Sequence, residues 1–423
     1  MKHAHWLVGV LTLFLVACGG QPPADGNGPG ASSCRETLAG DFTVPTSLRN
    51  VSGRTEACDY FIANPGSGDH TVRVTAALDI GPGTVIRVAD NVRIRVGSGG
   101  SITSRGTGAE PVVLAGTTAE QGSWYGLCFA DGYMDSSLDH TEIRWAGNLF
   151  TGAGSSVCNG AISGASDPRE SGILNVTNSL IFGSYTSGVS TFGLNLGVFS
   201  NNVLANNRLY GASVTTGNLG RLEHGDYLGT SADAPNGEPY VLVYGTMNEA
   251  ASMQTWRKLN APYFVTREGN AGNILLNDGV HVEIEPGVTF VMDAGTSFSI
   301  ENGSSLSAEG TAAEPITFRG VEDSPGFWTG IRFRGSGPSI MRNAEVAWAG
   351  GDPDVLPYGS FYLYLAGGTG DIELHDVTVR GSSTCGIWAS DSGSQGVIIE
   401  NPRFVDHNDR FDEMCGPFQP AGG

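Results

Sequence analysis

The side chains with the most catalytic potential in this chain are carboxylates, and they occur in three groups. Asp131, Asp135 and Asp139 recur at every fourth position of a loop-like stretch. The other two groups lie in the second half of the chain and comprise Asp352 with Asp354, and Asp406 with Asp409, Asp412 and Glu413. Such carboxylates could bind calcium through oxygen or share the acid–base work of glycoside hydrolysis. None has the spacing of an EF-hand or of a nonapeptide calcium repeat, so the sequence favours solvated loops.

Other catalytic motifs are missing from the sequence. No serine lies in a G-x-S-x-G element, and neither H-E-x-x-H nor C-x-x-C occurs. Glu223-His224-Gly225-Asp226 combines residue types suited to acid–base chemistry, but its position at the end of a repeat described below predicts a loop. We therefore assign no catalytic, cofactor-binding or metal-binding residue from the sequence, and we expect no cofactor.

The charge of the chain excludes one class of function. The net charge is −20, and Lys2 and Lys258 are the only lysines. Nucleic-acid binding needs a basic surface, so we expect no nucleic-acid partner. An acidic exterior also repels anionic polymers and anionic lipids, and its simplest role is to keep an exported protein soluble.

The N-terminus has the three parts of a secretory signal segment, which we place at residues 1–18. Lys2 precedes an apolar stretch, residues 6–16, that is shorter than the roughly 20 apolar residues needed to span a bilayer. The following Leu-Val-Ala-Cys resembles a bacterial lipobox. The resemblance implies a lipid on Cys18 and a membrane partner through that anchor. The alternative is an ordinary signal peptide cut near Ala17, which would leave Cys18 as a free thiol.

The stretch after Cys18, residues 19–33, is rich in glycine and proline and has no periodicity, which predicts a flexible tether. The residue after the anchor is Gly19 rather than the aspartate that commonly retains lipoproteins in the inner membrane. By resemblance, this favours an exported protein that is anchored in the outer membrane of the cell envelope.

The remaining cysteines form three sequence-local couples. An even number of cysteines in an exported chain predicts disulfides, and six cysteines allow 15 pairings. Each local couple closes a loop of about 25 to 30 residues, for which the chain-entropy estimate is about 3 kcal/mol of stabilisation. The predicted pairs are Cys34 with Cys58, Cys128 with Cys158, and Cys385 with Cys415.

A long internal repeat sets the domain organisation. Ile80-Gly81-Pro82-Gly83 aligns with Ile284-Glu285-Pro286-Gly287 at an offset of 204 residues, and the match continues to Trp124 over Trp328. After one deletion, Trp145 aligns with Trp348. We infer two copies of one unit. The predicted domains are 34–215 for the first copy, 216–260 for a connection and 261–423 for the second copy.

A shorter period of 22 to 25 residues runs within each copy. Val72 and Val74 recur as Ile94 and Val96, and Ile80 recurs as Ile102. Similar recurrences begin at Asn178 and Asn201, and at Asp376 and Asn401. Alternating apolar residues predict strands, and this period with glycine and asparagine turns predicts a parallel solenoid. We expect the asparagines at corners with left-handed backbone. The leucine-rich repeat is the alternative solenoid, but its leucine–asparagine consensus is missing.

The opening of each copy resembles a known family. Residues 283–288 (Glu-Ile-Glu-Pro-Gly-Val), 310–318 (Gly-Thr-Ala-Ala-Glu-Pro-Ile-Thr-Phe) and 328–333 (Trp-Thr-Gly-Ile-Arg-Phe) are similar to bacterial pectin-lyase-like right-handed β-helix repeat proteins. The resemblance implies an all-β, right-handed parallel β-helix in two tandem homologous copies. It does not imply one activity, because the fold hosts lyases, hydrolases, adhesins and other proteins.

Two tryptophans, a tyrosine-rich interval and one helical segment are further expectations from the sequence. Trp328 and Trp348 are expected in the core. Tyr362 and Tyr364 lie in a long interval that is a candidate inserted loop, but they alternate like residues of a core strand. The best candidate for a helix is residues 247–258.

Polysaccharide cleavage is the enzyme hypothesis that the resemblance suggests, as either a lyase or a glycoside hydrolase. The polygalacturonase motifs Asn-Thr-Asp, Asp-Asp, Gly-His-Gly and Arg-Ile-Lys are absent, and no arginine lies in a lyase signature. We therefore expect an envelope-anchored, non-catalytic scaffold whose partner is a polysaccharide or a protein of the envelope. A purely structural spacer is the third hypothesis. Exposed aromatic side chains on a flat face would favour the binding function.

Overall fold

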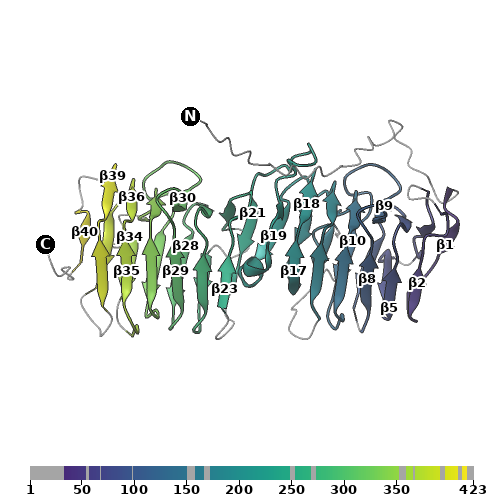
Figure 1. Cartoon of the computed structure of the whole chain (residues 1–423), viewed down its shortest axis with the longest axis horizontal. Coiled ribbons are helices and arrows are strands. Elements are labelled where there is room, and N and C mark those ends of the chain that lie inside the picture. Colours follow the sequence, from purple (N-terminus) through teal and green to yellow (C-terminus); the bar gives the residue numbers. More distant parts are fainter. Residues whose placement is uncertain are drawn as a thin grey trace, which may run out of the picture.

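The computed structural model describes residues 33–53, 57–66, 68–97, 99–149, 158–165, 172–247, 253–267, 273–351, 359–364, 367–390, 396–407 and 412–416. Within these residues the chain forms short strands that stack side by side in an elongated body (Figure 1). Every pair of neighbouring strands is parallel, as a β-solenoid requires. The predicted parallel β-helix architecture is therefore confirmed. The predicted signal segment, Cys18 and most of the tether lie outside the described residues.

In the first repeat each coil visits three sheets in the order B, C, A. Sheet A contains β1 (Glu36–Leu38), β3 (Tyr60–Ile62), β6 (Val85–Val88), β9 (Val112–Gly116), β12 (Thr141–Arg144), β15 (Leu180–Phe182), β18 (Asn202–Ala205) and β20 (Gly225–Asp226). Sheet C contains β2 (Thr46–Leu48), β5 (Ala77–Ile80), β8 (Ser101–Arg105), β11 (Ser136–Asp139), β14 (Leu174–Thr177) and β17 (Leu196–Ser200).

Sheet B runs through both repeats without a break. Its first part contains β4 (Thr71–Val74), β7 (Arg93–Val96), β10 (Gly126–Phe129), β13 (Ile162–Gly164), β16 (Val189–Ser190) and β19 (Ala212–Thr215). Its second part contains β21 (Val241–Tyr244), β24 (Tyr263–Val265), β27 (Thr289–Met292), β30 (Ile316–Gly320), β33 (Ala344–Ala347), β36 (Thr378–Arg380) and β39 (Arg403–Val405). The two repeats are therefore one continuous stack along this sheet.

Two further sheets complete the coils of the second repeat. Sheet D contains β22 (Thr246–Met247), β25 (Asn273–Leu276), β28 (Ser297–Glu301), β31 (Gly330–Arg334), β34 (Gly359–Tyr364), β37 (Cys385–Ala389) and β40 (Met414–Cys415). Sheet E contains β23 (Met253–Trp256), β26 (His281–Ile284), β29 (Ser305–Glu309), β32 (Ser339–Arg342), β35 (Ile372–His375) and β38 (Val397–Glu400).

Homologous strands of the two repeats belong to different sheets. The Pro82-Gly83 turn precedes β6, which belongs to sheet A, whereas the equivalent Pro286-Gly287 turn precedes β27, which belongs to sheet B. By the same alignment, β7 of sheet B corresponds to β28 of sheet D. The pairing of the strands therefore changes between the repeats.

A short 3₁₀ helix, η2 (Thr216–Arg221), lies at the junction of the repeats. It follows β19 and takes the place where the next strand of sheet C would lie, so sheet C ends at β17. Gln254 of β23 binds this helix from the following coil: its Nε2 donates to the Gly217 carbonyl at 2.8 Å. The predicted helix over 247–258 is wrong for Met253–Trp256, which form β23, because those residues pair in parallel with β26.

The core consists of side chains that alternate inward along each strand. The register pairs Val72 with Ile94 and Val74 with Val96, which confirms the 22-residue period on sheet B. On sheet C, however, Ile102 pairs with Leu78 rather than with Ile80 as expected. The corner between the two sheets is longer than the alignment assumed. A two-residue shift keeps the same side chains inward, so the sequence pattern does not reveal it.

Aromatic rings form part of the core of the second repeat. Tyr263, Phe290 and Phe318 stack in one column, with centroids 5.3 Å and 5.1 Å apart. Trp328 is fully buried, as predicted. Each such side chain contributes roughly 1.5–3 kcal/mol through burial alone.

The expectation for Trp348 is wrong. Its side chain is only partly buried, and its backbone has a φ of 64°. The residue lies at a corner, with its ring over Gly381 of the following coil. A β-carbon on Gly381 would come within 2.1 Å of that ring. Trp145 of the first repeat has the same geometry over Gly183, so the ring-over-glycine contact belongs to the repeated unit.

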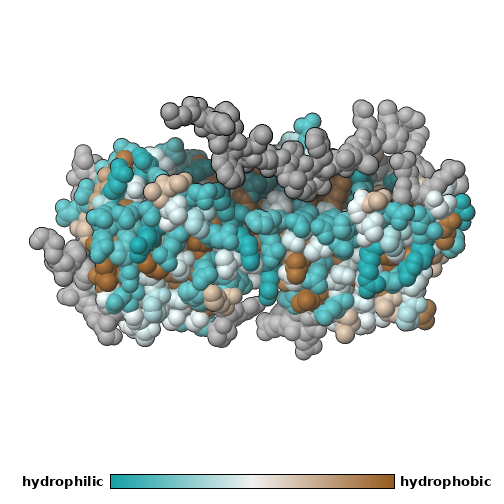
Figure 2. Space-filling model, in the orientation of Figure 1, coloured by the Kyte–Doolittle hydropathy of each residue, from teal (hydrophilic) through white to brown (hydrophobic). Residues whose placement is uncertain are grey.

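The corner asparagines and the disulfides agree with the sequence. Asn178, Asn201 and Asn401 have φ values of 51°, 55° and 53°, in the left-handed region. The amide of Asn201 donates to the side-chain oxygen of Asn178 at 3.4 Å, which forms one step of an asparagine ladder. The three predicted disulfides are all present: Cys34–Cys58, Cys128–Cys158 and Cys385–Cys415. The outer surface is largely hydrophilic on the face shown in Figure 2.

Candidate functional site

The carboxylates that the sequence singles out serve mainly as local supports. Asp139 accepts hydrogen bonds from Thr177 and Asn178, each at 2.8 Å. Asp135 accepts the backbone N–H of Ile173 at 3.0 Å. These bonds tie one coil to the next. Among the described residues, no three His, Cys, Asp or Glu side chains are grouped so that they could hold a metal ion.

The later acidic groups are only partly described. Asp352, Asp354 and Asp409 lie outside the described residues. Asp406 accepts a hydrogen bond from Arg380 Nη1 at 3.1 Å, and Arg380 Nε also binds Glu345 at 2.9 Å.

The Glu223–Asp226 segment is organised around one carboxylate. Asp226 accepts bonds from the backbone N–H groups of Leu228, Gly229 and Ser231, the last at 2.6 Å. The side chains of Thr230, Ser231 and Asn260 donate to it as well. Burial alone would raise the pKa of Asp226, but the bonds from Ser231 and Asn260 outweigh burial and leave this pKa below its usual value. The carboxylate therefore holds the junction loop and has no lone pair left for catalysis.

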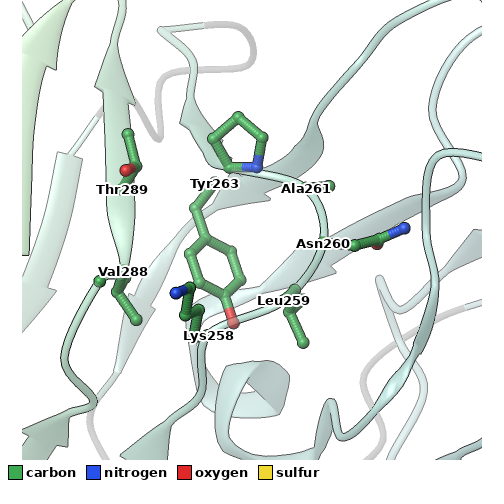
Figure 3. A pocket seen from close by; sticks show the side chains of 9 residues that line it. Lys258, Leu259, Asn260, Ala261, Tyr263, Val288 and Thr289 are labelled. Atoms are coloured by element: carbon green, nitrogen blue, oxygen red, sulfur yellow. The ribbon is translucent and has the colours of Figure 1, made fainter. Parts of the chain in front are cut away.

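A small cavity lies at the corner that follows the junction. It has a volume of about 230 Å³ and lies between Lys258, Tyr263 and Thr289 (Figure 3). The Tyr263 hydroxyl donates to the Arg257 carbonyl at 2.7 Å, and burial raises the pKa of Tyr263 far above its usual value. Lys258 Nζ lies 2.7 Å from a carboxylate oxygen of Glu314. Asn260 also lines the cavity and donates to Asp226, so Lys258, Tyr263 and Asn260 are all engaged in structural contacts.

The most distinctive outward surface is a row of planar side chains on sheet D, which we call the planar row. It consists of Arg332 and Arg334 of β31, Tyr362 and Tyr364 of β34, and Trp388 of β37. The strand register places Arg332 beside Tyr362, Arg334 beside Tyr364, and Tyr362 beside Trp388.

Two ring contacts order the planar row. Tyr362 stacks on Trp388 with centroids 4.7 Å apart and an interplanar angle of 10°. This separation equals the strand spacing of a sheet, so the rings stack along the axis of the solenoid. Tyr364 lies beside Tyr362 with centroids 6.5 Å apart and planes within 4°. The residue that follows β37 beside Tyr364 is Ser390, which has a small side chain. Tyr364 is 41% exposed.

The charge of the planar row is basic. Arg334 has one acidic partner within reach, Glu301, at 3.5 Å, and both side chains reach solvent. The row therefore combines flat apolar rings with guanidinium groups on a protein whose net charge is −20.

The sequence predicted Tyr362 and Tyr364 as inward residues of a strand, whereas both belong to its outward side. The alternation of Tyr362 and Tyr364 was correct for a strand, but Phe361 and Leu363 are the buried residues of β34. When both alternating sets of a strand are apolar, alternation alone does not show which set faces the core. Trp388 was not singled out, and the signal that could have found it is its place one period after Tyr362.

Comparison with protein-family models, curated proteins and solved structures gives no match for this chain. The likeness to pectin-lyase-like repeat proteins stays a prediction from sequence. Among the described residues, no helix is long and apolar enough to cross a membrane.

Proposed function

We propose that this protein is an envelope-anchored β-helix that binds a glycan through the planar row on sheet D and does not cleave it. The observation that carries the proposal is the partly exposed stack of Tyr362, Tyr364 and Trp388 beside two arginines. Aromatic rings offer flat apolar area to the C–H faces of sugar rings, while guanidinium groups donate to hydroxyl or carboxylate oxygens. Stacked strands hold these side chains on a rigid surface, which lowers the entropy cost of binding.

The absence of cleavage is proposed because two of the candidate carboxylates make structural bonds. Asp139 and Asp226, which the sequence offers for acid–base work, hold loops in place. No acidic residue of the described chain lies in the planar row itself; Glu301, at its edge, faces Arg334.

Binding and turnover should be measured together on the chain without its anchor, residues 19–423, with a glycan array and a reducing-end assay, with and without calcium. For any glycan that binds, we expect Tyr364→Ala and Trp388→Ala each to weaken binding about fivefold to tenfold, since one stacked ring contributes about 1 kcal/mol or more. Phe192→Ala is the matched control, because Phe192 is 54% exposed on the first repeat. Cleavage of any glycan would overturn the non-catalytic assignment. Equal loss in the control would overturn the site.

The anchor is proposed from the lipobox at Cys18. An acylated Cys18 followed by the tether of residues 19–33 would hold the β-helix near a membrane of the cell envelope, with Gly19 favouring the outer membrane. Mass spectrometry of the mature N-terminus should find a lipid-modified cysteine. Cys18→Ala should release the protein from membranes, and an unmodified thiol at Cys18 would refute the anchor.

A further inference from the structure

Three arginines lie on two neighbouring strands of the first repeat, far along the chain from the planar row. They are Arg73 of β4 and Arg93 and Arg95 of β7, and they alternate with the buried residues Val72, Val74, Ile94 and Val96. The register places Arg73 directly beside Arg95. Like charges in that arrangement destabilise a sheet, so their presence calls for a reason.

The negative charge around this arginine cluster is unevenly distributed. Arg73 forms an ion pair with Asp69 and lies 3.8 Å from Asp41. Arg93 is nearly buried, and its Nη2 donates to the hydroxyl of Thr71 at 2.9 Å. For Arg95, no hydrogen bond or ion pair of its side chain is found within the part of the chain that the structure describes. Burial is the main cause that lowers the pKa of Arg93; repulsion from Arg95 adds to it, and Asp69 acts in the opposite direction.

A cavity of about 140 Å³ opens between these arginines. Its lining includes Arg73, Arg95, Thr75 and Gly97, with Asp131 at one side. This volume holds a few water molecules or one oxyanion group, given about 30 Å³ for each water. Two guanidinium groups on neighbouring strands can each direct N–H donors to the same oxyanion.

The second repeat shows that the fold does not require these arginines. The homologous strands β25 and β28 pair Asn273 with Ser297 and Leu275 with Ser299. Arg73 is thus replaced by Leu275, and Arg95 by Ser299, at positions with the same backbone register. The inward residues remain apolar in both repeats. The arginine cluster therefore belongs to the first repeat alone and adds repulsion that the second repeat does without.

We propose that Arg73 and Arg95 form a binding site for an oxyanion group, a sulfate ester or a carboxylate, carried by an anionic polysaccharide. The cavity admits the charged group, and the polymer lies across the outer face of sheet B. The net charge of −20 repels polyanions from the rest of the surface, so binding depends on the guanidinium groups of Arg73 and Arg95. The inference is independent of the planar row, because glycan binding by the aromatic rings could fail while this site still bound an anion.

The test uses polymers that share one neutral backbone: dextran, carboxymethyl-dextran and dextran sulfate. We expect calorimetry at low salt to detect binding of one or both charged polymers and none of dextran. Dextran sulfate alone would assign the site to sulfate, and carboxymethyl-dextran alone to carboxylate. Binding should weaken as salt is raised from 50 to 200 mM, because a charge-dominated contact is screened.

Matched variants separate the site from general charge. Arg95→Gln should weaken binding at least tenfold, and Arg95→Lys should restore part of it. Arg105→Gln is the control, because it removes the same charge from sheet C, where Arg105 is paired with Asp79 at 3.1 Å. Both glutamine variants should unfold at the wild-type temperature, as neither side chain is buried. The proposal is overturned if neither charged polymer binds better than dextran, or if Arg105→Gln weakens binding as much as Arg95→Gln.

Discussion

The junction between the repeats depends on the buried carboxylate of Asp226, and this dependence gives a quantitative prediction. Asp226→Asn keeps the shape of the side chain but replaces one acceptor oxygen with a donor amide. In one orientation the new amide meets the N–H and hydroxyl of Ser231, which now donate to Oδ2 at 2.6 Å. In the other it meets the donors of Leu228, Gly229, Thr230 and Asn260. Two donors lose their acceptor in the first orientation and four in the second.

Each buried donor left without an acceptor costs about 1–3 kcal/mol. The junction loop is partly exposed, so some of these donors can turn to water, and we expect a loss of about 3 kcal/mol. Hydrogen exchange at the amides of residues 228–231 measures this locally. The expected effect is about 100-fold faster exchange, since 1.4 kcal/mol corresponds to a factor of ten.

The control for this prediction is Asp233→Asn. Asp233 is exposed in the same loop. Its substitution removes the same charge as Asp226→Asn, so it should alter the exchange rates of residues 228–231 less than threefold. Acid should reproduce the mutant: because the pKa of Asp226 lies below its unfolded value of about 3.9, its contribution is present above that pH and is lost as the pH falls through the folded pKa. Unchanged exchange in Asp226→Asn, or equal effects of both variants, would refute the assignment of Asp226 as the support of the junction.

Two further predictions concern the second repeat. The hydrogen bond that His375 donates to Glu373, with one that it donates to Glu400, raises the pKa of His375 despite partial burial. Its stabilisation is therefore complete below about pH 6.5 and is lost as the pH rises through the higher folded pKa. Exchange of the β38 amides, corrected for intrinsic rates, should therefore accelerate above neutral pH, and His375→Gln should abolish that dependence. Gly381→Ala should destabilise by about 2–4 kcal/mol in urea unfolding, because the new methyl group overlaps an indole ring and φ is 58°. Gly367→Ala, with φ of 80° and open space, should cost about 1 kcal/mol; equal losses would mean that the ring contact contributes nothing.

The sequence contains most of what determines the coils and little of what determines their placement. Apolar alternation and the 22-residue recurrence of Val72 as Ile94 predict the stacked strands correctly, because every coil buries the same positions. The slip between Ile80 and Ile102 arises at a corner, where residues can be added in pairs without exposing the core. The change of sheet partners between the repeats has the same origin. It depends on η2 and the coils of 216–260, whose sequence shows no repeat.

The candidate surfaces were harder to predict, for a related reason. Catalytic motifs are recognisable by spacing along the chain, whereas a surface on a solenoid collects one residue from each coil. Arg332, Tyr362 and Trp388 become neighbours only through the register of three strands separated by about 30 residues each. The pairing of β31, β34 and β37 follows from aligning their buried residues. A correct alignment of these three strands would therefore have predicted the planar row.

The two repeats provide an internal comparison that separates folding from function. At inward positions both repeats keep apolar residues of similar size, such as Val72 and Ile274, because each must fill the same column. At outward positions of homologous strands the chemistry diverges: Arg95 corresponds to Ser299, and Cys128 of the first repeat to Arg332 of the second. Cys128 is explained by its disulfide with Cys158, whereas Arg95 lies on the same backbone as Ser299 and is not required by the core. The arginine cluster belongs to sheet B of the first repeat and the planar row to sheet D of the second, so each set of outward side chains is particular to one repeat.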